Sequence, residues 1–128
     1  MALTAITVVS FGYLHDTPPS ADITLDLRRH FRDPHVDPAL RHMTADDLPV
    51  RRAVLGTPGI RELITATALL ADAYDAGPAE APLTIAAGCA GGRHRAATVA
   101  MTLAARLRKT GATVHLAHRD LAKPVVER

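Results

Sequence analysis

The sequence predicts a single α/β domain, with a mostly parallel sheet flanked by helices, on three observations. Stretches with strand character and stretches with helical spacing follow one another in the order β, β, α, α, β, α, β. Helical crossovers between the later strands favour a parallel or mixed sheet. A glycine-rich turn joins the third strand to a helix, as at the ligand-binding edge of such sheets. The 128 residues suffice for one core, so residues 1–128 are assigned to one domain.

The N-terminal part of the chain carries the first two predicted strands. Residues 3–9 are mostly apolar and β-branched, which predicts a buried strand. Residues 10–13 (Ser-Phe-Gly-Tyr) are predicted to turn the chain at the ligand edge of the sheet. Residues 22–28 alternate between apolar and polar side chains, which predicts the second strand.

Residues 29–47 show no regular period, and Pro34 and Pro38 exclude a long helix there. A long irregular stretch in a small domain is usually functional or disordered. Its charged and imidazole side chains favour a functional loop; they are Arg29, His30, Arg32, Asp33, His35, Asp37, Arg41 and His42. His35 lies between two Asp-Pro flanks and is the best candidate in this loop for a polar ligand contact.

The remainder of the chain is predicted to hold three helices and two strands. The helices are expected at residues 46–55, 57–76 and about 92–110, with Gly56, Gly77 and Gly111 as their stops. The strands are expected at residues 83–87 and 112–118.

The turn at residues 88–95 reads Gly-Cys-Ala-Gly-Gly-Arg-His-Arg and is predicted to bind phosphate. Its glycines let several backbone N–H groups point at one anion, and the following helix adds its positive dipole end. Arg93 and Arg95 would be unfavourable there unless an anion neutralised them. The predicted ligand-binding residues are Ser10, Gly12, His15, His35, Cys89, Ala90, Gly91, Gly92, Arg93, His94 and Arg95.

Charge is unevenly distributed along the chain, whose formal net charge is +2. Residues 1–92 carry 7 Arg against 11 Asp and Glu, a net of −4. Residues 93–128 carry 8 Lys and Arg against 2 Asp and Glu, a net of +6. This asymmetry favours an anionic partner such as phosphate, a nucleotide or RNA.

The composition also sets expectations about location and metals. The single cysteine excludes an intramolecular disulfide, and neither a signal peptide nor a membrane-spanning run is evident. We therefore expect a cytoplasmic protein with no membrane partner. The 7 histidines show no zinc-site spacing with Cys89, so we expect no metal and no cofactor.

Two other interpretations of the glycine turn stay open. Cys89 to Arg95 fits C-x-x-G-x-x-R, the spacing with which cysteine phosphatases wrap a loop around phosphate and attack it. Gly88 and Ala96 depart from that pattern, and no aspartate is marked as the acid, which disfavours this activity and leaves no catalytic residue assigned. The plainer alternative is a tight turn whose arginines are solvated and whose cysteine only packs.

Six stretches, in order along the chain, resemble those of one known family. They are residues 10–13, 26–28 (Asp-Leu-Arg), 33–41 (Asp-Pro-His-Val-Asp-Pro-Ala-Leu-Arg), 49–50, 88–95 and 118–121 (His-Arg-Asp-Leu). Over nearly its whole length the chain looks like the C-terminal domain of the RapZ family of RNase adaptor proteins. The resemblance implies a fold similar to a phosphofructokinase subdomain. It also implies binding of an amino-sugar phosphate (glucosamine 6-phosphate in the enterobacterial member), a part in small-RNA binding, and a homo-oligomer.

Residue by residue, the resemblance implies metabolite contacts at His35, Gly91 and Arg95. The family's loop threonine falls at Ala90, which lacks the hydroxyl, and its loop lysine at Arg93. His15 matches a histidine linked to RNA contact. The basic tail is similar in kind to an RNA-binding tail, though less rich in lysine, and contains Arg119, Lys123 and Arg128.

We therefore predict a non-catalytic sensor domain for a small phosphorylated metabolite, either an amino-sugar phosphate or a nucleotide-like compound. Binding is expected to order residues 29–47. These 128 residues contain no match to the family's N-terminal P-loop ATPase domain, so ATP hydrolysis by them is not expected. An RNA-binding adaptor module is the alternative.

Overall fold

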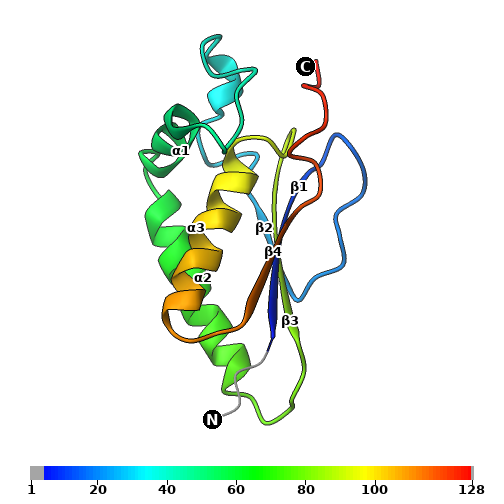
Figure 1. The fold of residues 1–128 in the computed structure, drawn as a ribbon, viewed down its shortest axis with the longest axis vertical. Helices are drawn as coiled ribbons and strands as arrows, with labels where there is room; N and C mark the ends of the chain where they lie inside the picture. The colour runs from blue at the N-terminus through cyan, green and yellow to red at the C-terminus, as the bar shows by residue number, and fades with distance from the viewer. Residues whose placement is uncertain (1–4, 128) are drawn as a thin grey trace.

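The computed structural model describes residues 5–127 and has the predicted order of elements. Four strands form one sheet in the order β2-β3-β1-β4; they are β1 (Ile6–Gly12), β2 (Ile23–Asp26), β3 (Leu83–Cys89) and β4 (Val114–His118). All three pairings are parallel, so the predicted α/β class with a parallel sheet is confirmed. The helices are α1 (Leu48–Leu55), α2 (Ile60–Asp75) and α3 (Arg95–Lys109) (Figure 1).

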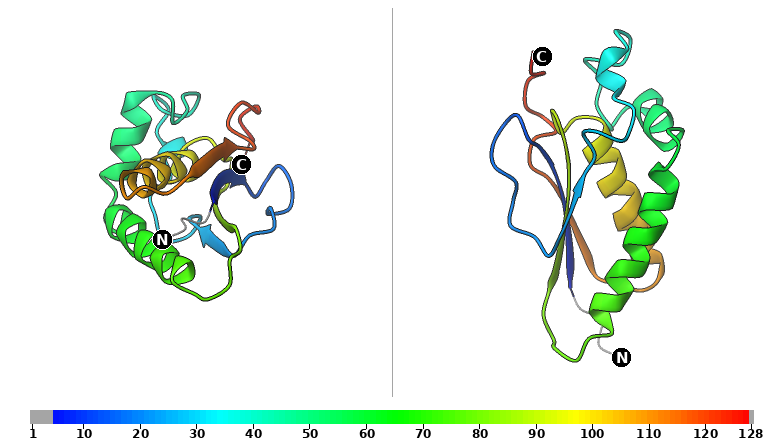
Figure 2. Two further views of the ribbon diagram at one scale, coloured as in Figure 1. Left: turned by 60° about the horizontal axis from the view of Figure 1, so that its bottom comes forward. Right: turned by 180° about the vertical axis from the view of Figure 1, so that it is seen from behind.

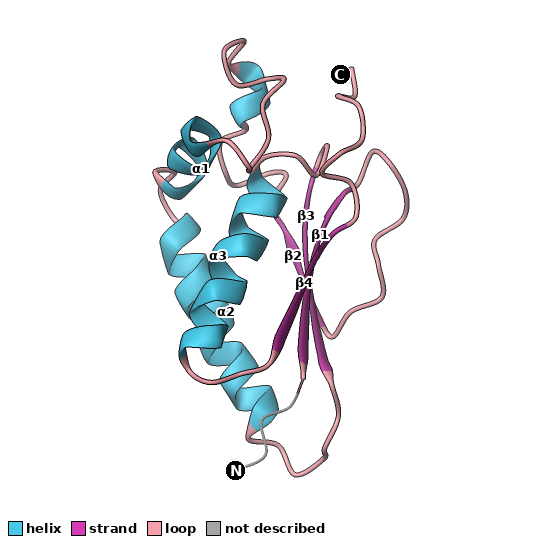
Figure 3. Cartoon of the chain, in the orientation of Figure 1, coloured by secondary structure: helices cyan, strands magenta, loops and turns pink. Residues whose placement is uncertain are grey.

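The three helices cover one face of the sheet, and the loop of residues 13–22 runs over the other (Figures 1 and 2). Because the strands are parallel, their carboxyl ends share one edge. The loops that follow the strands gather at that edge (Figure 3). None of the helices in the described part of the chain is long and apolar enough to cross a bilayer.

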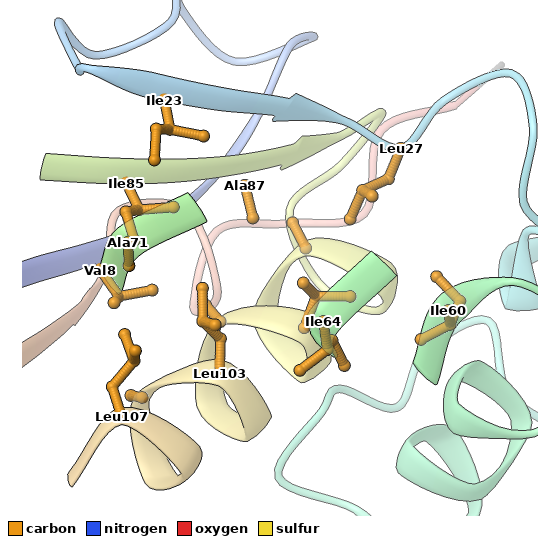
Figure 4. Close-up of a cluster of buried hydrophobic side chains, with 14 of the residues drawn as sticks. Val8, Ile23, Leu27, Ile60, Ile64, Ala71, Ile85, Ala87, Leu103 and Leu107 are labelled. Atoms are coloured by element: carbon orange, nitrogen blue, oxygen red, sulfur yellow. The ribbon is translucent and has the colours of Figure 1, made fainter. Parts of the chain in front are cut away.

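The core between the sheet and the helices is aliphatic, as an aromatic content of 3% requires. Val8 and Ile85 of the sheet meet Ile64 of α2 and Leu103 of α3 (Figure 4). Helix α3 lies closest to the strands because its buried face carries alanines; Ala96, Ala100 and Ala104 are fully buried. This packing fixes the N-terminus of α3 at the carboxyl end of β3.

Element boundaries differ from the prediction where glycines control the backbone. Strand β1 continues to Gly12, whose partner is Cys89, so the predicted turn at residues 10–13 begins only after the strand. Helix α3 begins at Arg95 and not near residue 92, because Gly92 has a φ of 77°, in the left-handed region. Residues 29–47 contain a short 3-10 helix, Pro34–Val36, and no long helix, as the two prolines predict.

Candidate functional site

The glycine turn packs directly on the end of β1. A Cβ atom at Gly12 would lie 2.5 Å from the carbonyl carbon of Gly91. One at Gly92 would lie 2.8 Å from the nitrogen of Gly12. Side chains are therefore excluded at both positions, and the two backbones hold each other in place. Gly12 therefore has a structural role here, and it does not line the pocket described below.

Asp120, which the sequence analysis did not assign to the site, stabilises this contact by binding the backbone of Gly12. Its carboxylate is fully buried and accepts a hydrogen bond from the Gly12 N–H at 2.7 Å. It also forms ion pairs with Arg119 at 2.8 Å and Lys123 at 2.6 Å. Burial alone would raise the pKa of Asp120, but the hydrogen bonds from Arg119, Lys123 and Gly12 outweigh it and lower the pKa to about 2.

Arg95 is buried, and its guanidinium connects the loop after β2 to the glycine turn by hydrogen bonds and an ion pair. Only 3% of the residue is exposed. Its Nη1 donates to three carbonyl oxygens at 2.9–3.1 Å, those of Leu27, Arg28 and Phe31. Its Nη2 lies 3.2 Å from Asp33 Oδ2. Arg95 is predicted to bind phosphate, but its two Nη groups are already bonded within the protein. Its buried Nε, in contrast, has no hydrogen-bond partner among the described residues.

Arg93 shows the same pattern. Its Nη1 donates to the carbonyl of Lys123 at 2.8 Å and its Nη2 to the carbonyl of His42 at 2.9 Å. It thereby joins the C-terminal segment to the loop of residues 29–47. Its Nε is buried and, within the described chain, also lacks a partner. Each of two neighbouring arginines therefore keeps one N–H donor unused.

Both arginines line one small pocket at the carboxyl edge of the sheet. Its walls come from the loop of residues 29–47, the glycine turn and the C-terminal segment; the lining residues are Asp33, His35, Cys89, Gly91, Arg93, His94, Arg95, Val125 and Val126. A buried donor without a partner costs about 1–3 kcal/mol, and such groups call for a physical explanation. The pocket therefore brings together two arginines that each keep an unused donor.

A larger pocket lies at the opposite, amino end of the strands. Its described lining residues include Asp22 and Asp75 and contain no cationic side chain. It suits no anion, so the two arginines place the candidate site at the carboxyl edge.

Two of the three predicted histidines border the pocket. His35 is held at its backbone, since its N–H donates to Asp33 Oδ1 and its carbonyl accepts from Arg41 Nε. His94 is 4% exposed, and its Nε2 lies 2.8 Å from the Met43 carbonyl, which requires a proton on that nitrogen. Burial, outweighing that hydrogen bond, lowers the pKa of His94.

Four further predicted residues lie outside the pocket lining. Ser10 faces the helices, fully buried, with its Oγ 2.6 Å from His118 Nδ1. Ala90 and Gly92 serve the turn through their backbones. His15 lies in the loop after β1 and has a buried Nε2 without a partner in the described part of the chain, but it does not border the pocket. Ser10 therefore has a packing role in this structure.

Cys89 does line the pocket, but its surroundings differ from those expected for a phosphatase nucleophile. Its sulfur accepts a hydrogen bond from the N–H of Ala96 at 3.4 Å, and 3% of the residue is exposed. The Arg95 fork that would clamp the substrate faces backbone carbonyls. Asp33 is ion-paired with Arg95 and therefore is not placed as a proton donor. These contacts weigh against the phosphatase interpretation.

The residues predicted for RNA contact are mostly engaged within the domain. Arg119 donates to Asp120 and to the carbonyls of Gly12, Asp16 and Thr17, which fastens the loop after β1. Lys123 pairs with Asp120 and keeps 44% of its side chain exposed. Arg128 lies outside the described residues. No group of three or more potential metal ligands occurs within residues 5–127.

Comparison with known proteins agrees with this architecture. Residues 4–122 match the family model of the RapZ C-terminal domain. A nucleotide-binding protein of Thermobifida fusca is 42% identical over 120 residues, which cover 91% of this chain and 40% of that protein. Proteins of the same description from Salinispora tropica and Rhodospirillum rubrum are 40% and 41% identical. The chain spans about 40% of the length of these relatives. The chain therefore belongs to the RapZ C-terminal domain family.

Proposed function

We propose that this domain binds a small phosphorylated metabolite at the carboxyl edge of its sheet and does not transform it. The observation that carries the proposal is the pair of buried, unpartnered Nε donors, those of Arg93 and Arg95, in one pocket. A phosphate oxygen is a strong acceptor for guanidinium N–H groups. The N-terminus of α3, a helix of 15 residues, adds backbone N–H groups and a positive dipole end beside them.

The remaining lining residues favour an amino-sugar phosphate over other phosphorylated compounds. Asp33 places a carboxylate in the pocket that holds the two arginines. A carboxylate repels a bare phosphate but attracts an ammonium group, so the pocket suits a ligand that carries both. The relatives are named nucleotide-binding proteins, which supports a nucleotide-like ligand as the other member of this class.

Calorimetric titration tests this function. The purified chain is titrated with glucosamine 6-phosphate, a nucleoside monophosphate and inorganic phosphate, and the same series is repeated with Arg95→Ala. Arg61→Ala, which removes an exposed arginine of α2 that does not line the pocket, is the matched control. Saturable binding that survives Arg61→Ala and fails in Arg95→Ala, with the ligand recovered intact, supports the proposal. Absence of binding across the panel contradicts it.

An RNA-binding adaptor module is the second candidate. The net charge of +6 over residues 93–128 and the exposed part of Lys123 favour it. Binding to RNA that weakens steeply with added salt would support this function, because each neutralised phosphate releases counterions. RNA affinity that is independent of salt would count against it.

A further inference from the structure

The C-terminal segment, residues 121–127, forms one wall of the pocket, and we call it the strap. Val125 and Val126 line the pocket and are half-buried, whereas residues 122–124 are exposed. The strap follows the turn after β4 and rises beside the glycine turn at the carboxyl edge of the sheet (Figures 1 and 2). The strap and the loop of residues 29–47 therefore lie on opposite sides of the glycine turn.

The covered pocket is too small for the proposed ligand. Its cavity volume is about 10 Å³, which is room for about one water molecule. A phosphate group is several times larger than a water molecule, and a sugar phosphate is larger again. One wall of the pocket must therefore move before such a ligand can reach both Nε donors.

Two of the three walls are firmly held. The glycine turn is wedged against β1 by Gly12 and by the left-handed Gly92. The loop of residues 29–47 is held by the contacts of Arg95 with Phe31 and Asp33 and by the Met43 carbonyl bonded to His94. Moving either wall would break several buried hydrogen bonds at once.

The strap is the weakly held wall. Its one backbone–backbone bond in the described chain runs from the Lys123 N–H to the Asp120 carbonyl at 3.1 Å. The Lys123 carbonyl also accepts from Arg93 Nη1, and residues 124–127 make no backbone hydrogen bond to the rest of the described chain. The side chain of Lys123 also pairs with Asp120 at 2.6 Å, which anchors the strap at residue 123. Beyond that anchor, residues 124–127 are held by two half-buried valines. Segments with so few contacts open at the lowest free energy.

We propose that the strap gates the pocket and that a bound phosphorylated ligand holds it open. This gate rests on the proposed function. In the closed state the Lys123 carbonyl occupies Arg93 Nη1, a donor that suits phosphate. Opening the strap releases that donor, so ligand oxygen and strap carbonyl compete for the same N–H. The position of residues 122–127 at the surface of the domain then depends on whether a ligand occupies the pocket.

Nuclear Overhauser contacts from the methyl groups of Val125 and Val126, measured by NMR on the full chain, test the gate. Glucosamine 6-phosphate and inorganic phosphate are the probes, and binding is measured independently by calorimetry. We expect the saturating sugar phosphate to remove the contacts of both valines with the other residues that line the pocket. Contacts that persist with the sugar phosphate demonstrably bound overturn the gate and leave the proposed function standing. If neither probe binds, the proposed function fails and the gate fails with it.

A double variant, Val125→Ser with Val126→Ser, keeps every charge of the strap but removes its apolar contacts. We expect an association rate for the sugar phosphate about fivefold or more above that of the unaltered chain. Leu69→Ser with Leu70→Ser, on the exposed side of α2, is the control and should leave this rate unchanged. An association rate equal to that of the unaltered chain would contradict the gate.

Discussion

The carboxylate of Asp120 accepts the Gly12 N–H at 2.7 Å, across 108 positions of sequence, and joins the turn after β4 to the end of β1. Gly12 in turn contacts Gly91 and Gly92 in the glycine turn. The buried carboxylate of Asp120 thus supports the glycine turn, which carries the proposed site, through the backbone of Gly12. Of its two cationic partners, Arg119 lies just before the strap and Lys123 lies within it.

Asp120→Asn should lower the free energy of unfolding at pH 7 by about 3–5 kcal/mol, because it leaves the cationic partners of a buried ion-pair network without their charge. Urea unfolding measures the effect. Asp72→Asn, an exposed aspartate of α2, is the control and should change stability by no more than about 0.5 kcal/mol.

The pH dependence of the same variant gives a second readout of that carboxylate. The folded-state pKa of about 2 lies below the value of about 3.9 expected in the unfolded chain. The stability that Asp120 provides is therefore complete above about pH 4 and lost as the pH falls toward 2. An equal acid sensitivity of Asp120→Asn and the unaltered chain would show that the carboxylate is not held as described.

His94 should make the domain less stable in mild acid. Burial lowers its folded-state pKa, so below about pH 6.5 the unfolded chain binds the extra proton more readily. Stability should fall as the pH is lowered from 7.5 to 5.5, and His94→Gln should show a smaller fall. The urea midpoints of both proteins at the two pH values decide this. An equal fall in both would remove His94 as the cause.

Gly92→Ala should destabilise the domain more than Gly111→Ala. Both glycines have a positive φ, 77° and 94°, so both substitutions carry the left-handed penalty of about 1 kcal/mol. At Gly92 the added Cβ would also lie 2.8 Å from the Gly12 nitrogen, whereas Gly111 is exposed. Thermal unfolding of the two variants compares the costs. Equal losses would mean that the turn and β1 are not in the close contact described.

Arg95→Lys should weaken both stability and ligand binding. Lysine keeps the positive charge but cannot hydrogen-bond to the three carbonyls and to Asp33 at the same time. It also lacks the Nε–H donor that the proposed ligand would use. We expect a loss of at least about 2 kcal/mol of stability, measured by urea unfolding. The two hydrogen bonds that Arg93 donates to backbone carbonyls are exposed, so Arg93→Lys should cost less stability. It should also reduce phosphate affinity. The reverse order would contradict the roles assigned to the two arginines.

The sequence predicts the order of elements and the glycine turn well, because strand alternation, helical spacing and glycine stops are local signals. The role of Arg95 could not be predicted in this way, because its conformation is set by carbonyls 64–68 positions away. The residues around Asp120 in the sequence do not indicate that it is buried, because its burial depends on its contact with Gly12, which is 108 positions away. The valines of the strap resemble an ordinary tail until the fold brings them to the pocket.

The most direct test of the central claim is the NMR signal of the arginine Nε–H groups. The Arg93 and Arg95 signals, assigned with the two lysine variants, are followed as glucosamine 6-phosphate is added to the full chain, with Arg61 as the internal control. The account predicts saturable shifts of the Arg93 and Arg95 signals at one common affinity while the Arg61 signal stays in place. Unmoved Arg93 and Arg95 signals under conditions in which calorimetry detects binding would place the ligand elsewhere and contradict the account.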